Sequence, residues 1–139
     1  MIYGGINFIA VFVATVAGMA SGAVWYGLFK EPWRTANGLT DADIKGADDA
    51  RYGGASRYLI AGLAKLVMAF CLAKLMEVLD AISVGNGIAL ALFLWIGFIA
   101  TSLSVNHRFQ LKPWTLTAID GGYWLLVMVL QAVIIGFFG

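Results

Sequence analysis

The chain has 139 residues, of which 61% are hydrophobic and 12% are charged, and its mean hydropathy is +0.86. Because soluble domains carry about 25% charged residues, this composition excludes an ordinary water-soluble domain, and it excludes a disordered chain as well. The net charge of +1 provides no electrostatic basis for binding nucleic acid. We therefore expect a small integral membrane protein.

Four apolar stretches are each long enough to cross a bilayer, which takes about 17–25 helical residues. Lipid-exposed backbone must satisfy its own hydrogen bonds, and the chain lacks the alternating pattern of a membrane barrel, so each stretch should be helical. We expect transmembrane helices over residues 6–29, 57–79, 85–105 and 118–138. The predicted fold class is all-α, a polytopic membrane protein with four transmembrane helices in an up-down bundle that forms a single domain over residues 1–139.

The first stretch contains small residues at every fourth position, namely Ala10, Ala14, Gly18 and Gly22. Small side chains let helix backbones approach closely, which stabilises helix pairs in lipid. We expect Gly18 and Gly22 to pack against another helix of the same chain. An interface between copies of the chain is the alternative interpretation. Gln131, deep in the fourth stretch, is expected to hydrogen-bond to another helix.

Residues 30–56 form the one long connection, in which Thr40 and Asp43 have the spacing of a capping box that begins a short surface helix. Seven basic residues lie in or beside this loop and the shorter loop over residues 106–117, namely Lys30, Arg34, Lys45, Arg51, Arg57, Arg108 and Lys112. The turn over residues 80–84, on the opposite side, contains none. Because basic loops stay in the cytoplasm, we expect both loops inside and both termini outside.

Lys65 lies deep within the second predicted helix, about nine residues or roughly 13 Å from the end that adjoins the long loop. A charge near that depth costs on the order of 2.5–3.5 kcal/mol on insertion, so the ammonium needs compensation. One interpretation places it in an intramembrane polar cluster, whose candidate members at a similar level are Ser21, Thr101, Ser102 and Asp120. In the alternative, the flexible stem carries the ammonium to the lipid headgroups.

The sequence predicts no catalytic, cofactor or metal site. His107 and Cys71 are the single residues of their types, and neither His-x-x-x-His nor Cys-x-x-Cys spacing occurs. The sequence also lacks a recognisable Ser/His/acid set and a glycine-rich phosphate loop. We therefore expect a protein that is not an enzyme and that holds no cofactor.

Several short motifs lie near the ends of the predicted helices. They comprise Gly22-Ala-Val-Trp25-Tyr26-Gly27-Leu28-Phe29 followed by Trp33, Gly38-Leu39-Thr40, Val105-Asn106 with Phe109, and Gly122-Tyr123-Trp124. In this series the chain resembles a bacterial family of small four-helix integral membrane proteins that is classified as a domain of unknown function. The resemblance implies the same fold, in the inner (plasma) membrane of a bacterium, and it implies no activity.

Three functions remain open for such a protein. We expect a non-catalytic accessory or scaffold subunit that acts through helix–helix contacts, with the lipid bilayer and either other membrane subunits or further copies of itself as partners. The alternative is a homo-oligomeric channel or small-solute transporter, in which Lys65, Ser21 and Gln131 would line the path. A third hypothesis is an interfacial lipid or quinone enzyme that uses His107, Arg108 and Asp120.

Overall fold

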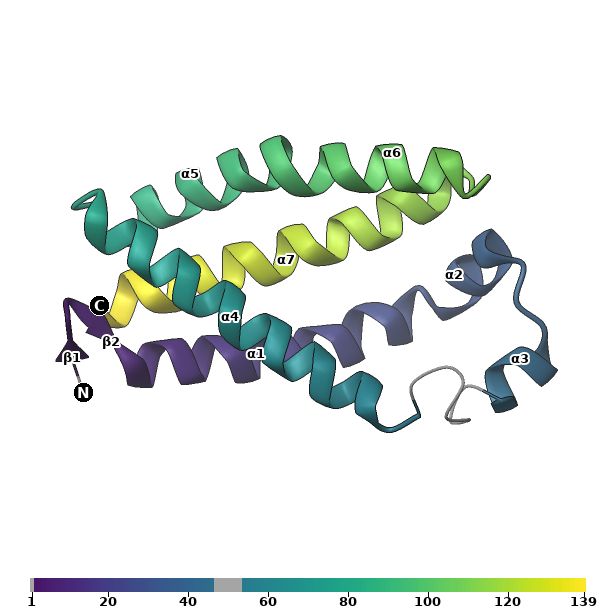
Figure 1. Cartoon of the computed structure of the whole chain (residues 1–139), viewed down its shortest axis with the longest axis horizontal. Coiled ribbons are helices and arrows are strands. Elements are labelled where there is room, and N and C mark those ends of the chain that lie inside the picture. Colours follow the sequence, from purple (N-terminus) through teal and green to yellow (C-terminus); the bar gives the residue numbers. More distant parts are fainter. Residues whose placement is uncertain (1, 47–53) are drawn as a thin grey trace.

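The computed structural model describes residues 2–46 and 54–139. Four long helical spans run alternately in opposite directions (Figure 1). They are α1 (Phe8–Leu28), α4 (Ser56–Val78), the span formed by α5, η3 and α6 (Val84–Phe109), and α7 (Trp114–Phe138). Each span is long and apolar enough to cross a membrane. The predicted all-α fold, with four transmembrane helices in an up-down bundle, is thereby confirmed.

The third span is continuous but changes its hydrogen-bonding pattern halfway. It consists of α5 (Val84–Leu94), the π-helical turn η3 (Trp95–Ala100) and α6 (Thr101–Phe109). Because α6 continues past residue 105 and α7 begins before residue 118, the connection is shorter than the predicted loop over residues 106–117. The helix continues because its polar last turn, which hydropathy does not recognise as part of a span, finds hydrogen-bond partners on α7.

A short hairpin precedes α1, where the sequence predicted helix from residue 6. Strands β1 (Ile2–Tyr3) and β2 (Ile6–Asn7) pair antiparallel across Gly4-Gly5, both of which have the positive φ that glycine adopts without strain. The side-chain oxygen of Asn7 accepts hydrogen bonds from two backbone N–H groups of the first helical turn and so caps α1. Its Nδ2 donates to the carbonyl oxygen of Phe138 at 3.0 Å, which joins the two ends of the chain.

Two short helices, α2 (Lys30–Asn37) and α3 (Asp41–Lys45), occupy the first part of the long connection (Figure 1). The predicted capping box is confirmed, because Thr40 and Asp43 each accept a hydrogen bond from the other's backbone N–H group. The backbone N–H and the hydroxyl of Thr40 hold the pKa of the Asp43 carboxyl below its usual range. Residues 47–53 of the predicted loop lie outside the described residues.

Helix α7 lies at the centre of the bundle, because it packs along α1 and also along α5. Its buried face meets α4 and α5 in a core of small and flexible apolar side chains, namely Ala69, Leu72, Met76, Ala91, Met128, Ala132 and Ile135. The third span buries the smallest share of its residues, so most of its surface is left for the surroundings of the bundle.

The small residues of α1 face α4 and α7 of the same chain. A Cβ added to Gly18 would lie 3.2 Å from the Cδ of Lys65, and one added to Gly22 would lie 2.9 Å from the hydroxyl oxygen of Tyr123. Ala10 and Ala14 are fully buried as well. Contacts within the chain therefore occupy this stripe.

We predict that Gly22→Leu lowers the free energy of unfolding by about 1–3 kcal/mol, because the new side chain must displace the buried Tyr123 ring. The matched control is Gly62→Leu in α4, where an added Cβ meets no atom of the described residues within 4 Å. Thermal melting of both variants in the same detergent is the measurement. Equal melting temperatures for the two variants would show that the stripe is not a packing site.

Candidate functional site

Lys65 is buried inside the bundle, with 4% of its surface exposed. Its Nζ lies 5.1 Å from the ring centroid of Tyr123 and 5.0 Å from that of Trp124. A cation over an aromatic face is attracted by the ring quadrupole, and the attraction is strongest where water is excluded. The absent side chain of Gly18 leaves room for the lysine stem. The ammonium is therefore held by aromatic rings of α7.

The four residues proposed as partners of Lys65 hydrogen-bond elsewhere. The hydroxyl of Ser21 donates to the Gly18 carbonyl of its own helix, and Asp120 accepts from Tyr26. Thr101 and Ser102 are exposed, and their hydroxyls donate to carbonyl oxygens one turn earlier in the third span. Similar depth was the basis for grouping these residues, but the rotation of each helix turns their side chains toward different neighbours.

Gln131 makes the interhelical hydrogen bond that the sequence predicts. Its Nε2 donates to the backbone carbonyl of Lys65 at 3.0 Å, which ties α7 to α4 in the middle of the bundle. The Oε1 of the same side chain is buried and accepts no hydrogen bond from the described residues. The amide therefore joins the two helices beside Lys65 through one hydrogen bond.

A second polar group gathers around Asp120 at the loop end of the bundle. The hydroxyl of Tyr26 donates to Asp120 Oδ1 at 2.7 Å, and Nε2 of His107 lies 3.5 Å from Asp120 Oδ2. Nδ1 of His107, which is 6% exposed, lies 2.9 Å from the hydroxyl oxygen of Thr117. These contacts join α1, α6 and α7.

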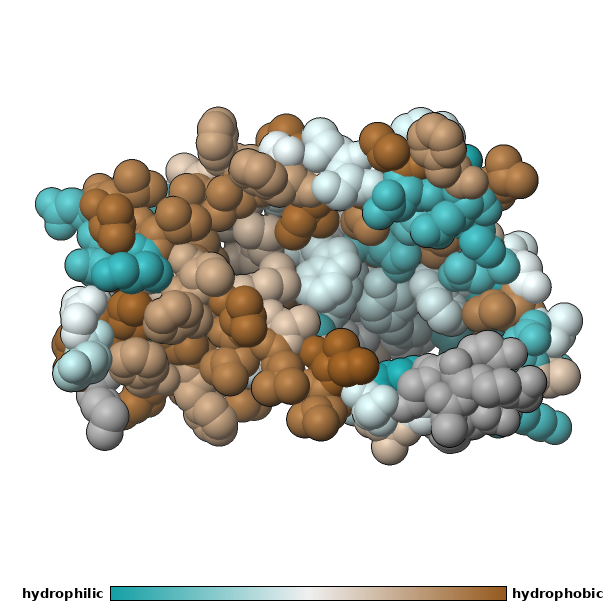
Figure 2. All heavy atoms as spheres, in the orientation of Figure 1, coloured by the Kyte–Doolittle hydropathy of each residue, from teal (hydrophilic) through white to brown (hydrophobic). Residues whose placement is uncertain are grey.

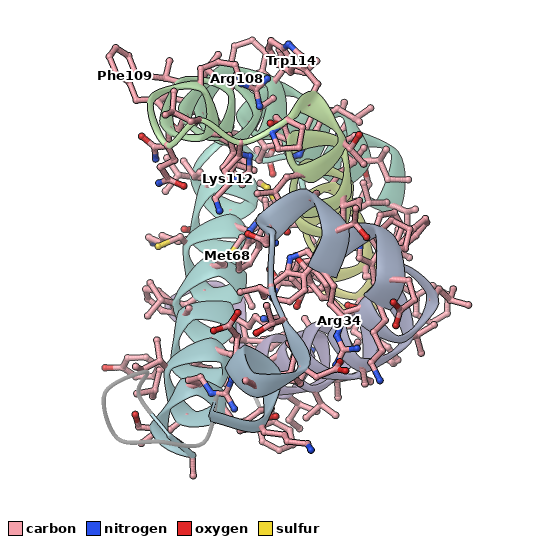
Figure 3. The ribbon with its side chains drawn as sticks, turned by 90° about the vertical axis from the view of Figure 1, so that its right-hand side faces the viewer. Arg34, Met68, Arg108, Phe109, Lys112 and Trp114 are labelled. Atoms are coloured by element: carbon pink, nitrogen blue, oxygen red, sulfur yellow. The ribbon has the colours of Figure 1, made fainter. Side chains whose placement is uncertain are left out.

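Arg108 closes the same group from the side of the α6–α7 turn. Its Nη2 donates to the Thr117 hydroxyl at 2.6 Å and to the Pro113 carbonyl at 3.1 Å. Its guanidinium carbon lies 3.6 Å from the ring centroid of Trp114, and Figure 3 shows the two side chains together at the edge of the molecule. The Thr117 hydroxyl is thus held between Arg108 and His107 and is buried, which suits a structural contact better than nucleophilic attack.

Sequence reasoning named His107, Arg108 and Asp120 but missed Tyr26, Thr117 and Trp114 as their partners. One signal was available, because Thr117 and Asp120 are three residues apart and share a face of α7. The contact with Tyr26 depends on how α1 is rotated against α7, which no local pattern reveals.

Two tryptophans fix the loop half of α7 from its two sides. The Nε1 of Trp25 in α1 donates to the Ile119 carbonyl at 2.9 Å, and the Nε1 of Trp95 in η3 donates to the Gly121 carbonyl at 2.8 Å. A Cβ on Gly122 would lie 2.8 Å from the Trp25 ring. The absence of a side chain at Gly122 therefore makes room for the Trp25 ring.

A lateral cavity of about 620 Å³ opens at the loop end of the bundle, and residues of α1, α2, α3, α4, α6 and α7 line it. Figure 2 shows the hollow, in which pale residues of intermediate hydropathy lie between the brown surface of α4 and the teal end of α6. Its basic lining residues are Lys30, Arg34 and Arg57, and its aromatic lining residues are Tyr26, Trp33, Tyr58 and Trp124. Asp120 also lines it, with 20% of its side chain exposed. This lateral cavity combines both signs of charge with aromatic surface.

The sequence model of the family described as "Protein of unknown function (DUF1761)" matches residues 9–136. No curated protein and no solved structure matches the chain. The matched range includes the polar groups around Lys65 and Asp120 and the whole lining of the lateral cavity.

We predict that Lys65→Met leaves the free energy of unfolding unchanged or raises it. Methionine keeps an apolar stem between Gly18 and the rings of α7, and it removes an ammonium whose burial costs free energy. Lys65→Ala should be less stable than Lys65→Met by about 2–5 kcal/mol, because it leaves an unfilled space. Thermal melting in detergent compares the three proteins. If Lys65→Met is as unstable as Lys65→Ala, the ammonium itself holds the bundle together.

Proposed function

The chain belongs to this family of proteins of unknown function, and we propose that it is a non-catalytic accessory protein of a bacterial inner membrane that binds another membrane component. The observation that supports this function best is the lateral cavity, which opens in the side of the helical bundle (Figure 2). Binding pockets of a few hundred Å³ with mixed apolar and polar lining are typical of sites for small ligands.

The arrangement of the helices accounts for the cavity. Helices α4 and α5 are joined by a short turn, and Figure 1 shows α4 crossing the bundle obliquely, away from α6. The two spans therefore separate toward the loop end, and α2, which contacts α7, contributes Lys30, Trp33 and Arg34 to the lining of the cavity. A molecule that enters from the membrane would complete the packing between α4 and α6.

The small-residue stripe of α1 favours this function over a homo-oligomeric channel. Self-association through Gly18 and Gly22 would need the space that Lys65 and Tyr123 occupy. The Lys65 ammonium lies against two aromatic rings inside the bundle, which is a poor position for lining a path between copies. We propose that the protein acts through its lateral cavity.

A photoreactive benzophenone amino acid tests this function at two positions. Tyr58 lines the lateral cavity, whereas Phe93 is exposed on α5 and serves as the control. We expect the adduct masses at position 58 to differ from the bulk-lipid pattern at position 93. Leu103→Trp should fill the lateral cavity and return position 58 to the bulk pattern. Identical adducts at both positions, with or without Leu103→Trp, would contradict a binding function of this cavity.

We further propose that both termini lie outside and that both loops, residues 30–56 and 106–117, are cytoplasmic. Figure 3 looks at the loop end of the bundle, where Arg34, Arg108 and Lys112 gather. The Nζ of Lys112 donates to the Asn37 carbonyl at 3.0 Å and so attaches the second loop to α2. This concentration of basic residues at one end supports the orientation through the positive-inside rule.

Cysteine labelling tests the orientation in a Cys71→Ala background. A membrane-impermeant maleimide added to intact spheroplasts should label Ile2→Cys and not Asn37→Cys, and it should label both after lysis. Intact spheroplasts that label position 37 and protect position 2 would establish the opposite orientation.

A further inference from the structure

We propose that the lateral cavity binds a phospholipid whose headgroup carries a phosphate and a primary ammonium, with the ammonium at Asp120 and the phosphate at the basic wall. This assignment rests on the binding function proposed above and names its ligand. It follows from the order of charges, rings and apolar surface along the cavity.

The Asp120 carboxylate can accept hydrogen bonds from an ammonium group. Its Oδ1 accepts one hydrogen bond, from the Tyr26 hydroxyl at 2.7 Å, and its Oδ2 lies 3.5 Å from His107 Nε2. Two carboxylate oxygens offer about four acceptor positions, so positions remain for a ligand. A primary ammonium supplies three N–H donors and the opposite charge.

Aromatic rings beside Asp120 favour a cationic group in the same place. The rings of Tyr26 and Trp33 meet edge to face, with their centroids 6.0 Å apart, and both line the lateral cavity. Ring faces attract an ammonium, and the attraction is greatest when the group is desolvated. The Trp124 ring already contacts the Lys65 ammonium, and the Tyr58 ring contacts the Arg57 guanidinium, which leaves Tyr26 and Trp33 as the rings for the ligand.

The basic residues of the lateral cavity suit a phosphate. The Nη1 of Arg34 lies 3.5 Å from Glu31 and 3.7 Å from Asp41, both of which are exposed. Exposed ion pairs of this kind are weak, so a phosphate can compete with them for the guanidinium. Arginine presents a planar fork of N–H donors that matches phosphate oxygens. Lys30 and Arg57 add two further positive charges to the lining.

An apolar hollow continues the lateral cavity away from these charges. It has a volume of about 230 Å³, and it shares Leu103 and Trp124 with the lateral cavity. Its other apolar lining includes Met68, Phe98 and Ile99. Figure 3 shows Met68 on α4, below Lys112. A charged cavity that continues into an apolar hollow matches the headgroup of a phospholipid and the acyl chain that follows it.

The same geometry disfavours other phospholipids. The glycerol headgroup of phosphatidylglycerol would offer the Asp120 carboxylate neutral hydroxyl donors, which lack the opposite charge of an ammonium. The rings of Tyr26 and Trp33 would also attract a trimethylated ammonium, but this group has no N–H to donate to the carboxylate. We therefore expect selectivity for the primary ammonium over both.

Native mass spectrometry of the full-length protein in detergent tests the assignment. The protein is mixed with equal amounts of phosphatidylethanolamine, its N,N-dimethyl derivative, phosphatidylcholine and phosphatidylglycerol, all with the same acyl chains. We expect phosphatidylethanolamine to be bound about tenfold more than phosphatidylcholine, with the dimethyl lipid between them. Because this series varies only the lipid, it needs no variant that must fold. Equal binding of all four, or preference for phosphatidylglycerol, would overturn the assignment.

Three variants locate the site. Asp120→Asn should remove the preference for phosphatidylethanolamine over phosphatidylcholine, and the control Asp80→Asn, in the turn after α4 at the opposite end, should keep it. Arg34→Gln should weaken the binding of all four lipids by a similar factor. A preference that survives Asp120→Asn would overturn the assignment of the ammonium.

Leu103→Trp separates this assignment from the binding function on which it rests. If the wild type prefers a lipid other than phosphatidylethanolamine and Leu103→Trp abolishes that preference, the lateral cavity binds a lipid but the headgroup assignment is wrong. If the wild type binds every lipid equally and Leu103→Trp changes nothing, both proposals are wrong.

Discussion

The atoms of the bundle itself must stabilise the buried ammonium of Lys65, because hydrocarbon cannot solvate a charge. Aromatic ring faces of α7 do so, and this arrangement restricts three helices at once. Helix α4 approaches α1 so closely that a Cβ added to Gly18 would lie 3.2 Å from the Cδ of the lysine stem. Helix α7 must present Tyr123 and Trp124 in succession at this level. Trp124 also lines the lateral cavity, so the burial of one charge helps to shape the opening at the loop end.

The loop end is organised by contacts to the backbone and side chains of α7. Indole N–H groups from α1 and from η3 donate to carbonyls of this helix, and Gly122 leaves space for the Trp25 ring. Asp120, in the same stretch, accepts a hydrogen bond from the Tyr26 hydroxyl and lies next to His107. These contacts position the wall that α7 contributes to the lateral cavity, while another wall is formed by α4, which diverges from the third span (Figure 1).

Properties that depend on local sequence could be predicted, and properties that depend on helix rotation could not. The four spans follow from runs of apolar residues, and the capping box of Thr40 and Asp43 follows from their spacing. The depth of Lys65 in the sequence indicated that its ammonium needs a compensating contact. Depth alone could not distinguish the hydroxyls of Thr101 and Ser102 from the rings of α7 as the neighbours of Lys65. The polar last turn of α6 was assigned to a loop because its hydrogen-bond partners lie on another helix.

The π-helical turn η3 determines which side of α6 meets the rest of the protein. Bonding from residue i to residue i+5 accommodates one more residue in a turn than an α-helix does. Since each residue advances an α-helix by about 100°, the faces of α5 and α6 are offset by about that angle from a continuous helix. The offset allows the apolar part of the third span to pack in the core through Ala91, while His107, several turns later, turns inward to Asp120. One irregular turn thus lets a single span present an apolar face in the core and a polar face at the loop end.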